Sequence, residues 1–212
     1  AALAGAGIDG EQIAAVVAEG TATADGDARE VQALSEALGA ARPAVTAVKG
    51  AAGHTTAASG LLNVAVAALV LEAGTVPAIV GTAAEQAGEP ELDLVLGSAR
   101  PLPLSDDGPS GALALAQGFQ GQSGVGEVKG GSPYGLARRR DRRRRPDRRP
   151  GGTIRMNQQH AAAQPRPVVV AVGAVTSQGR GAEATWEGVR DGNVAIRTVQ
   201  RLSTEGIRTD IA

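Results

Sequence analysis

The sequence has 212 residues and a formal net charge of −1, and this length suffices for one good-sized hydrophobic core or two small ones. It contains no cysteine, which excludes a disulfide framework, a thiolate nucleophile and a cysteine-based metal site in this chain. A single Trp, a single Tyr and a single Phe leave Ala, Val and Leu to build the core through close backbone approach.

The charge is unevenly distributed along the chain. Residues 1–130 carry 5 basic and 15 acidic side chains, whereas residues 131–212 carry 16 basic and 7 acidic ones. Two parts that differ this much suggest two pieces of different origin.

The first 130 residues alternate between strand and helix patterns. In chain order we expect a strand at Ile13–Ala18, a helix from the acidic stretch Asp25–Glu30 to Gly39, a strand at Ala44–Val48, and an Ala-rich helix capped by Thr55 or Thr56 and ended by Gly74. Further strands are expected at Val76–Val80, at Leu92–Leu96 and, as the last one, at Ala112–Phe119. This order is typical of a layered α/β domain.

No membrane partner is expected. The longest apolar run, Ala57–Leu71, is shorter than the roughly 18–20 residues that a bilayer requires, so we interpret it as a buried helix. The start Ala1–Gly5 has neither a Met nor a basic region and does not read as a signal peptide. With the lack of cysteine, this favours a cytoplasmic location.

The composition changes after Gly130. Residues 131–165 contain the Arg-rich run Arg138–Arg149 and lack apolar residues for a core, so a disordered linker is expected there. A strand followed by a helix at Ala182–Val189 marks residues 166–212 as a short βα fragment.

The Arg-rich run raises the alternative of a polyanion-binding protein. Arginines neutralise phosphates without regard to sequence, but this run has no interleaved aromatic residues and no recognisable binding fold around it. We therefore expect non-specific contacts and no specific nucleic-acid partner.

The strongest candidate for chemistry is the turn Lys49–His54 between the strand at 44–48 and the Ala-rich helix. Read alone, a histidine and a lysine in a Gly-rich turn are more typical of a structural turn than of a catalytic site. A position before a helix favours the neutral imidazole, the form that donates a hydrogen bond from one nitrogen.

Several motifs together resemble the β-ketoacyl-ACP synthases of the thiolase superfamily. That family has His-Gly-Thr-Gly-Thr, Gly-Asp-x-x-Glu, Lys-x-x-x-Gly-His, a small-residue helix and a Gly-Phe-Gly-Gly loop. The matching stretches here are Glu19–Thr23, Gly26–Glu30, Lys49–His54, Ala57–Gly60 and Gly118–Ser123. The resemblance covers most of residues 1–128 and implies a partial thiolase-like domain in residues 1–130, the C-terminal half of a synthase.

The resemblance also implies a reaction, the decarboxylative Claisen condensation of acyl and malonyl thioesters in fatty-acid or polyketide synthesis. In the family a cysteine holds the acyl chain and two histidines donate hydrogen bonds to the thioester carbonyl, one of them supported by a lysine. His54 matches the second histidine and Lys49 the lysine. Thr21, Thr23 and Phe119 match positions that line the substrate site.

This sequence departs from the pattern at Glu19, which stands where the first histidine is expected. An ionised carboxylate donates no hydrogen bond, and the loss of one such donor costs on the order of 10²–10³ in rate. Two interpretations stay open, an altered synthase and a non-catalytic chain length factor (KSβ) subunit that shapes the acyl tunnel. Lys49 and His54 fit the synthase better, whereas Glu19 fits the partner subunit.

A second, shorter resemblance covers Val168–Gly179, which is similar to the opening strand and loop of the same family, with about one residue missing near Ala171. The region of the nucleophilic cysteine is absent between the two matches. We expect the end of one synthase followed by the start of another, with Met156 as the start of the second product.

The resemblance further implies the partners. These are acyl carrier protein and a second ketosynthase subunit, in a homodimer or heterodimer. It implies no cofactor and no metal.

Overall fold

The computed structural model describes residues 3, 9–82, 92–102, 111–118, 123–129, 154–156 and 174–196. This part of the chain contains a six-stranded sheet in the order β4-β2-β1-β6-β7-β8. The strands are β1 (Ile13–Val17), β2 (Ala44–Thr46), β4 (Asp93–Leu94), β6 (Gly111–Gln117), β7 (Ser123–Lys129) and β8 (Ile154–Met156). The strands from β4 to β6 are parallel, and β7 runs antiparallel to both of its neighbours.

Strand β1 is the centre of the parallel part. It pairs with β2 through Val16↔Val45 and with β6 through Val16↔Leu113. All five of its residues are buried, as expected for a parallel strand that is covered on both faces. The register with β6 shifts between Ile13 and Ala15, and this irregularity places Ala14 and Ala15 in the same hydrophobic cluster.

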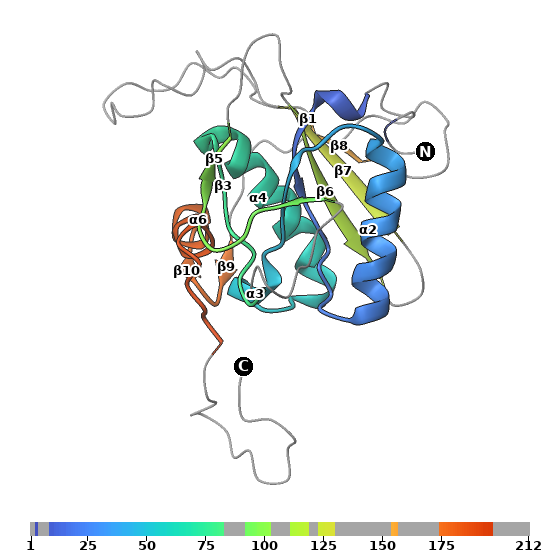
Figure 1. The fold of residues 1–212 in the computed structure, drawn as a ribbon. Coiled ribbons are helices and arrows are strands. Elements are labelled where there is room, and N and C mark those ends of the chain that lie inside the picture. Colours follow the sequence, from blue (N-terminus) through green and yellow to red (C-terminus); the bar gives the residue numbers. More distant parts are fainter. Residues whose placement is uncertain are drawn as a thin grey trace, which may run out of the picture.

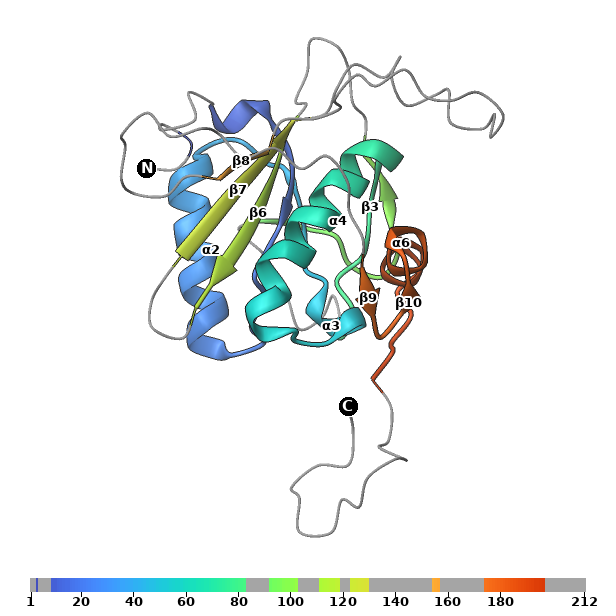
Figure 2. The same cartoon turned by 180° about the vertical axis from the view of Figure 1, so that it is seen from behind.

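Two helices cover the two faces of the sheet. Figure 1 shows α2 (Ala24–Leu38) on one side and α4 (Ser59–Ala73) on the other, and Figure 2 shows the same layers from behind. Leu34 and Leu38 of α2 pack with Val16, whereas α4 packs with Val17. Val16 and Val17, which follow each other in β1, therefore point to opposite faces of the sheet and belong to two separate hydrophobic clusters.

Helix α4 is the central core helix. By length and composition the segment Thr56–Ala73 would suffice to cross a membrane. In this structure α4 contacts β1 and β6, and its residues Val66, Ala67 and Val70 are fully buried. The prediction of a buried helix that ends at Gly74 is confirmed, with Gly74 in the left-handed conformation.

The start of α4 differs from the prediction. Neither Thr55 nor Thr56 caps it with a side chain; instead a 3₁₀ turn, η2 (Thr56–Ala58), leads into the helix. Before this turn the chain forms a one-turn helix, α3 (Lys49–Ala52), which the strand pattern over 44–48 did not predict. The Gly-rich turn is thus partly helical.

Most other elements lie near their predicted positions, with shorter strands. Asp9 precedes the 3₁₀ turn η1 (Gly10–Gln12), and its N–H donates to the side chain of Gln12. The strand expected at 76–80 is reduced to β3 (Thr75–Val76), which pairs with β5 (Arg100–Pro101), and the strand expected at 92–96 is reduced to β4.

Two strands lie beyond the expected end of the sheet. The strand at 112–119 is not the last one, because β7 follows and pairs with β6 along its whole length. Strand β8 lies within residues 131–165, where a disordered linker was expected, and it pairs with β7. The Arg-rich run itself lies outside the described residues.

Residues 174–196 pack against α3 and α4. They form a small hairpin of β9 (Val175–Thr176) and β10 (Gly179–Arg180), followed by α6 (Ala182–Arg190). The helix expected at 182–189 is confirmed. Trp186 and Val189 of α6 are buried in the hydrophobic cluster that also contains Val66 of α4. This segment therefore shares a core with the first part of the chain.

A buried polar side chain of α4 connects the two central strands. The amide nitrogen of Asn63 donates to the carbonyl of Ala18, just after β1, and to that of Leu115 in β6, at 3.2 and 2.8 Å. Asn63 is 1% exposed, so no water can replace these bonds easily.

Replacing this side chain tests its role. We expect Asn63→Ala to lower the free energy of unfolding by about 1–3 kcal/mol, because two carbonyls lose their donor. Urea unfolding followed by circular dichroism measures the change. The control is Leu61→Ala on the exposed face of the same helix, for which a change within about 0.5 kcal/mol is expected. A loss no larger than in this control would contradict the role of Asn63.

Candidate functional site

The candidate residues lie at the carboxyl ends of the parallel strands. Glu19 follows β1 and Lys49 follows β2, and the two strand ends are held together by a hydrogen bond from Ala18 N–H to the carbonyl of Thr46, at 2.7 Å. Ligands of open α/β sheets bind in the crevice outside this edge.

Glu19 and Lys49 form a buried ion pair. Lys49 Nζ lies 2.8 Å from Glu19 Oε1, and the two side chains are only 11% and 5% exposed. The same ammonium group also donates to the main-chain carbonyl of Glu19. Lys49 therefore compensates the carboxylate that stands in place of the expected histidine.

Two buried polar atoms among the described residues lack a hydrogen-bond partner, and both belong to this edge of the sheet. They are Glu19 Oε2 and Thr46 Oγ1. A buried polar atom without a partner is costly, and both cases among the described residues lie at this edge of the sheet.

The loop after β1 is held by α2. The hydroxyls of Thr21 and Thr23 lie 2.9 Å apart, and Thr21 donates to Asp27 while Thr23 accepts from the N–H of Gly26. A Cβ at Gly26 would lie 2.4 Å from Thr21 Oγ1 and 2.5 Å from Thr23 Oγ1. Only glycine allows this approach, and Thr23 serves as the N-cap of α2.

Glu30 anchors the same loop from inside. Its two carboxylate oxygens accept hydrogen bonds from the N–H groups of Glu19 and Gly20, at 2.6 and 2.9 Å. Burial raises the pKa of Glu30 above the ordinary glutamate value, although these two N–H groups act in the opposite direction. Glu19 and Asp27 add further to the rise through their negative charges.

His54 is placed by the start of the core helix. Its Nδ1 accepts a hydrogen bond from the N–H of Thr56, at 3.2 Å, and lies 3.1 Å from Ser59 Oγ. An Nδ1 that accepts from a backbone N–H carries no proton, so a neutral ring has its proton on Nε2. The side chain is exposed. The ring is thus oriented to donate from Nε2 at the surface.

Backbone strain marks both loops. The non-glycine residues with positive φ among the described ones are Ala22, at 57°, and Thr56, at 48°. One lies in the loop that Glu30 anchors and the other holds His54. Strain of this kind concentrates at functional sites.

The structure brings together some of the predicted site residues. It joins Glu19 to Lys49 and Thr21 to Thr23, all at the strand ends, and it fixes His54 through Ser59 and Thr56. Phe119 lies outside the described residues.

The roles of Ser59, Asn63 and Glu30 did not follow from the sequence. Ser59 and Asn63 are polar residues that interrupt the apolar pattern of the Ala-rich helix. This interruption is the sequence signal that could have indicated their roles. Glu30 is the last residue of the Gly-Asp-x-x-Glu motif.

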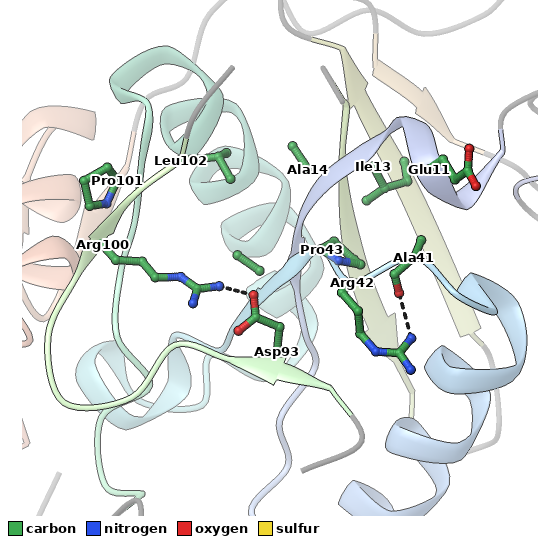
Figure 3. Close-up of a pocket in the computed structure, with 11 residues that line it drawn as sticks. Glu11, Ile13, Ala14, Ala41, Arg42, Pro43, Asp93, Arg100, Pro101 and Leu102 are labelled. Atoms are coloured by element: carbon green, nitrogen blue, oxygen red, sulfur yellow. Dashed lines mark hydrogen bonds and ion pairs between the residues drawn. The ribbon is translucent and has the colours of Figure 1, made fainter. Parts of the chain in front are cut away.

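A cavity of about 550 Å³ lies elsewhere, at the amino ends of the strands. Figure 3 shows its lining, with Arg100 paired to Asp93 and Arg42 bound to the carbonyl of Ala41. It contains none of the candidate residues, and its arginines are already engaged. Among the described residues there is no group of three metal-ligating side chains.

Comparisons with known proteins identify relatives of the first part of the chain. Residues 1–83 match the family model "Beta-ketoacyl synthase, C-terminal domain". A polyketide beta-ketoacyl synthase of Streptomyces coelicolor is 39% identical over 124 residues, which is 58% of this chain and 27% of the relative. The lovastatin diketide synthase of Monascus pilosus is 46% identical over 72 residues, 34% of this chain and 3% of the relative.

A solved structure agrees with these matches. The ishigamide ketosynthase/chain length factor superposes with a TM-score of 0.52 and 28% identity, over 58% of this chain and 29% of that one. The chain spans about a quarter of the length of the Streptomyces coelicolor relative. The predicted partial thiolase-like α/β fold is confirmed.

The buried ion pair predicts a strong effect of removing one partner. Lys49→Met leaves the Glu19 carboxylate buried without compensation, and we expect a loss of about 3–5 kcal/mol in the free energy of unfolding at neutral pH. The double variant Glu19→Gln, Lys49→Met should regain part of this loss. Arg190→Met, which removes an exposed ion pair with Asp191, is the control and should have little effect. Equal losses in Lys49→Met and the control would contradict the burial argument.

The raised pKa of Glu30 predicts the sign of a pH dependence. Above about pH 4.3, the ordinary glutamate value, the folded protein retains the Glu30 proton more than the unfolded chain does. The free energy of unfolding therefore falls as the pH rises from there through the folded pKa. Glu30→Gln should lack this decrease in urea unfolding between about pH 4 and 8, whereas Glu36→Gln, at an exposed position of α2, should keep it. A wild-type stability that rises relative to Glu30→Gln in this window would reverse the sign and contradict the assignment.

Proposed function

We propose, from the premise that the first part of this chain is the C-terminal half of a β-ketoacyl synthase-family protein, that it serves polyketide synthesis as a non-condensing partner subunit. Such a subunit corresponds to the chain length factor that the matched solved structure includes. The single observation that carries the proposal is the Glu19–Lys49 ion pair.

The ion pair removes two groups from condensation chemistry. A synthase of this family stabilises the charge that develops on the malonyl thioester with hydrogen-bond donors. Glu19 offers no donor when ionised, and Lys49 is engaged by both the side chain and the carbonyl of Glu19. Only His54 remains as a hydrogen-bond donor of the expected pair.

The retained geometry fits a structural role at the acyl channel. Glu30, Asp27 and Thr21 hold the loop after β1 in place although Glu19 stands where the family has a histidine. The proposed partners are a catalytic ketosynthase subunit, which would supply the cysteine, and the acyl carrier protein that delivers the thioesters. No cofactor is required for this role.

One observation favours a second candidate, an altered synthase. The bond from Thr56 N–H to His54 Nδ1 selects the tautomer that a carbonyl-polarising histidine needs. In that case His54 would still assist loss of carbon dioxide from a malonyl thioester, with the rate reduced on the order of 10²–10³ by the missing donor.

Decarboxylation of malonyl-carrier protein distinguishes the two candidates. We expect the wild-type chain to release no carbon dioxide above the uncatalysed background. The rate of release with His54→Ala should be the same as with the wild-type chain. Release of labelled carbon dioxide from the malonyl group measures the rate. Turnover by the wild-type chain that His54→Ala abolishes would overturn the partner-subunit proposal in favour of the altered synthase. Glu19→His is the matched variant, because it restores the missing imidazole in the same loop.

A further inference from the structure

The turn that carries Lys49 and His54 is bound by residues far along the sequence. Helix α3 has only four residues, so most of its carbonyls find no partner inside the helix. The carbonyls of Ala51 and Ala52 are instead bound by the segment 174–196. This contact is independent of the ion pair.

Three donors of that segment converge on the two carbonyls. Gln178 Nε2 donates to Ala51 O at 2.9 Å, and Ser177 Oγ donates to Ala52 O at 2.9 Å. The N–H of Ala195 also donates to Ala51 O, at 3.2 Å. All of these bonds lie within three residues of His54 in the sequence. They fix the direction of the peptide groups that lead into Gly53 and His54.

Gln178 is itself held in place by its own segment. Its Nε2 also donates to Asn193 O, at 2.6 Å, and its N–H donates to Thr176 Oγ1, at 3.2 Å. A Cβ on Gly188 of α6 would lie 2.2 Å from the side-chain oxygen of Gln178 and 2.5 Å from its Cδ. The missing side chain at Gly188 is what allows Gln178 to pass across α6 to the carbonyl of Ala51.

Apolar packing accompanies these hydrogen bonds. Trp186 is 8% exposed and Val189 is 1% exposed, and both belong to the cluster that includes Ala51 and Ala52. The contact therefore combines a buried aromatic anchor with directional polar bonds, as specific interfaces do.

We propose that residues 174–196 form a docking element whose partner is the α3 turn of this same chain, and that Gln178 is a positioning residue for Lys49 and His54. The sequence predicts that this region is the start of a second synthase-like domain, and in the structure its helix α6 shares a hydrophobic cluster with α3 and α4. This inference concerns the geometry of the turn, so it holds for an altered synthase and for a non-condensing subunit alike.

Hydrogen exchange in the full chain tests the proposal. Gln178→Ala should accelerate amide exchange in residues 49–58 by about threefold to tenfold, the factor that corresponds to the loss of one ordinary hydrogen bond. The matched control is Gln32→Ala, which removes an exposed glutamine from a side-chain bond to Glu36 on the far helix α2. Exchange of residues 49–58 should stay within twofold of wild type in this control.

Gly188→Ala provides a second, sharper variant. Alanine favours a helix over glycine, so α6 itself should not be weakened. The added methyl group should nevertheless displace Gln178 and accelerate exchange at residues 49–58. If it acts through Gln178, the double variant Gln178→Ala, Gly188→Ala should exchange no faster than Gln178→Ala alone.

The ring signals of His54 give a readout that a general loss of stability would not produce. The chain contains only two histidines, so a His54→Gln spectrum assigns them. The His54 ring resonances should shift in Gln178→Ala and in Gly188→Ala while circular dichroism shows an intact fold, and they should not shift in Gln32→Ala. Unchanged ring signals and unchanged exchange in both variants, or equal changes in the control, would overturn the proposal.

Discussion

The Lys49 ammonium group is the constraint on which the edge of the sheet depends. It contacts the carboxylate and the carbonyl of Glu19 at once, and so joins the loop after β1 to the helix α3 after β2. A buried pair of this kind adds little net stability, but an unpaired partner would be very costly. Its effect is to select one arrangement of the two loops that carry the candidate residues.

The small side chains of the core make this polar edge possible. Ala14 and Ala15 of β1 and Ala67 of α4 let the helix lie close to the sheet, so that Asn63 reaches carbonyls of two different strands. Ser59 and His54 continue the same line of polar contacts at the start of the helix. The Ala-rich composition thus determines how closely α4 approaches the site.

Local patterns predicted much of the fold, and the limits have physical causes. The apolar run of β1, the spacing of Leu34 and Leu38 and the stop at Gly74 depend on neighbours in sequence, and these elements were predicted. Strand β8 depends on pairing with a strand more distant in the chain, and the position of α6 depends on a cluster contributed by α4. The sequence shows that Glu19 replaces the expected histidine. That Lys49 compensates the charge of Glu19 could not be predicted, because this depends on which strand ends are adjacent in the sheet.

The docked segment also explains how two differently charged pieces can form one unit. Gln178 and Ala51 are separated by 127 positions, yet doubling the length of a flexible connection costs only about 0.6 kcal/mol in closure entropy. This is less than one ordinary hydrogen bond contributes, about 1 kcal/mol, and the contact has several such bonds together with the burial of Trp186. Added length in the intervening stretch therefore changes the closure cost only slightly. What determines the association is the fit of Gln178 and Trp186 to the end of α3, beside the turn that carries His54.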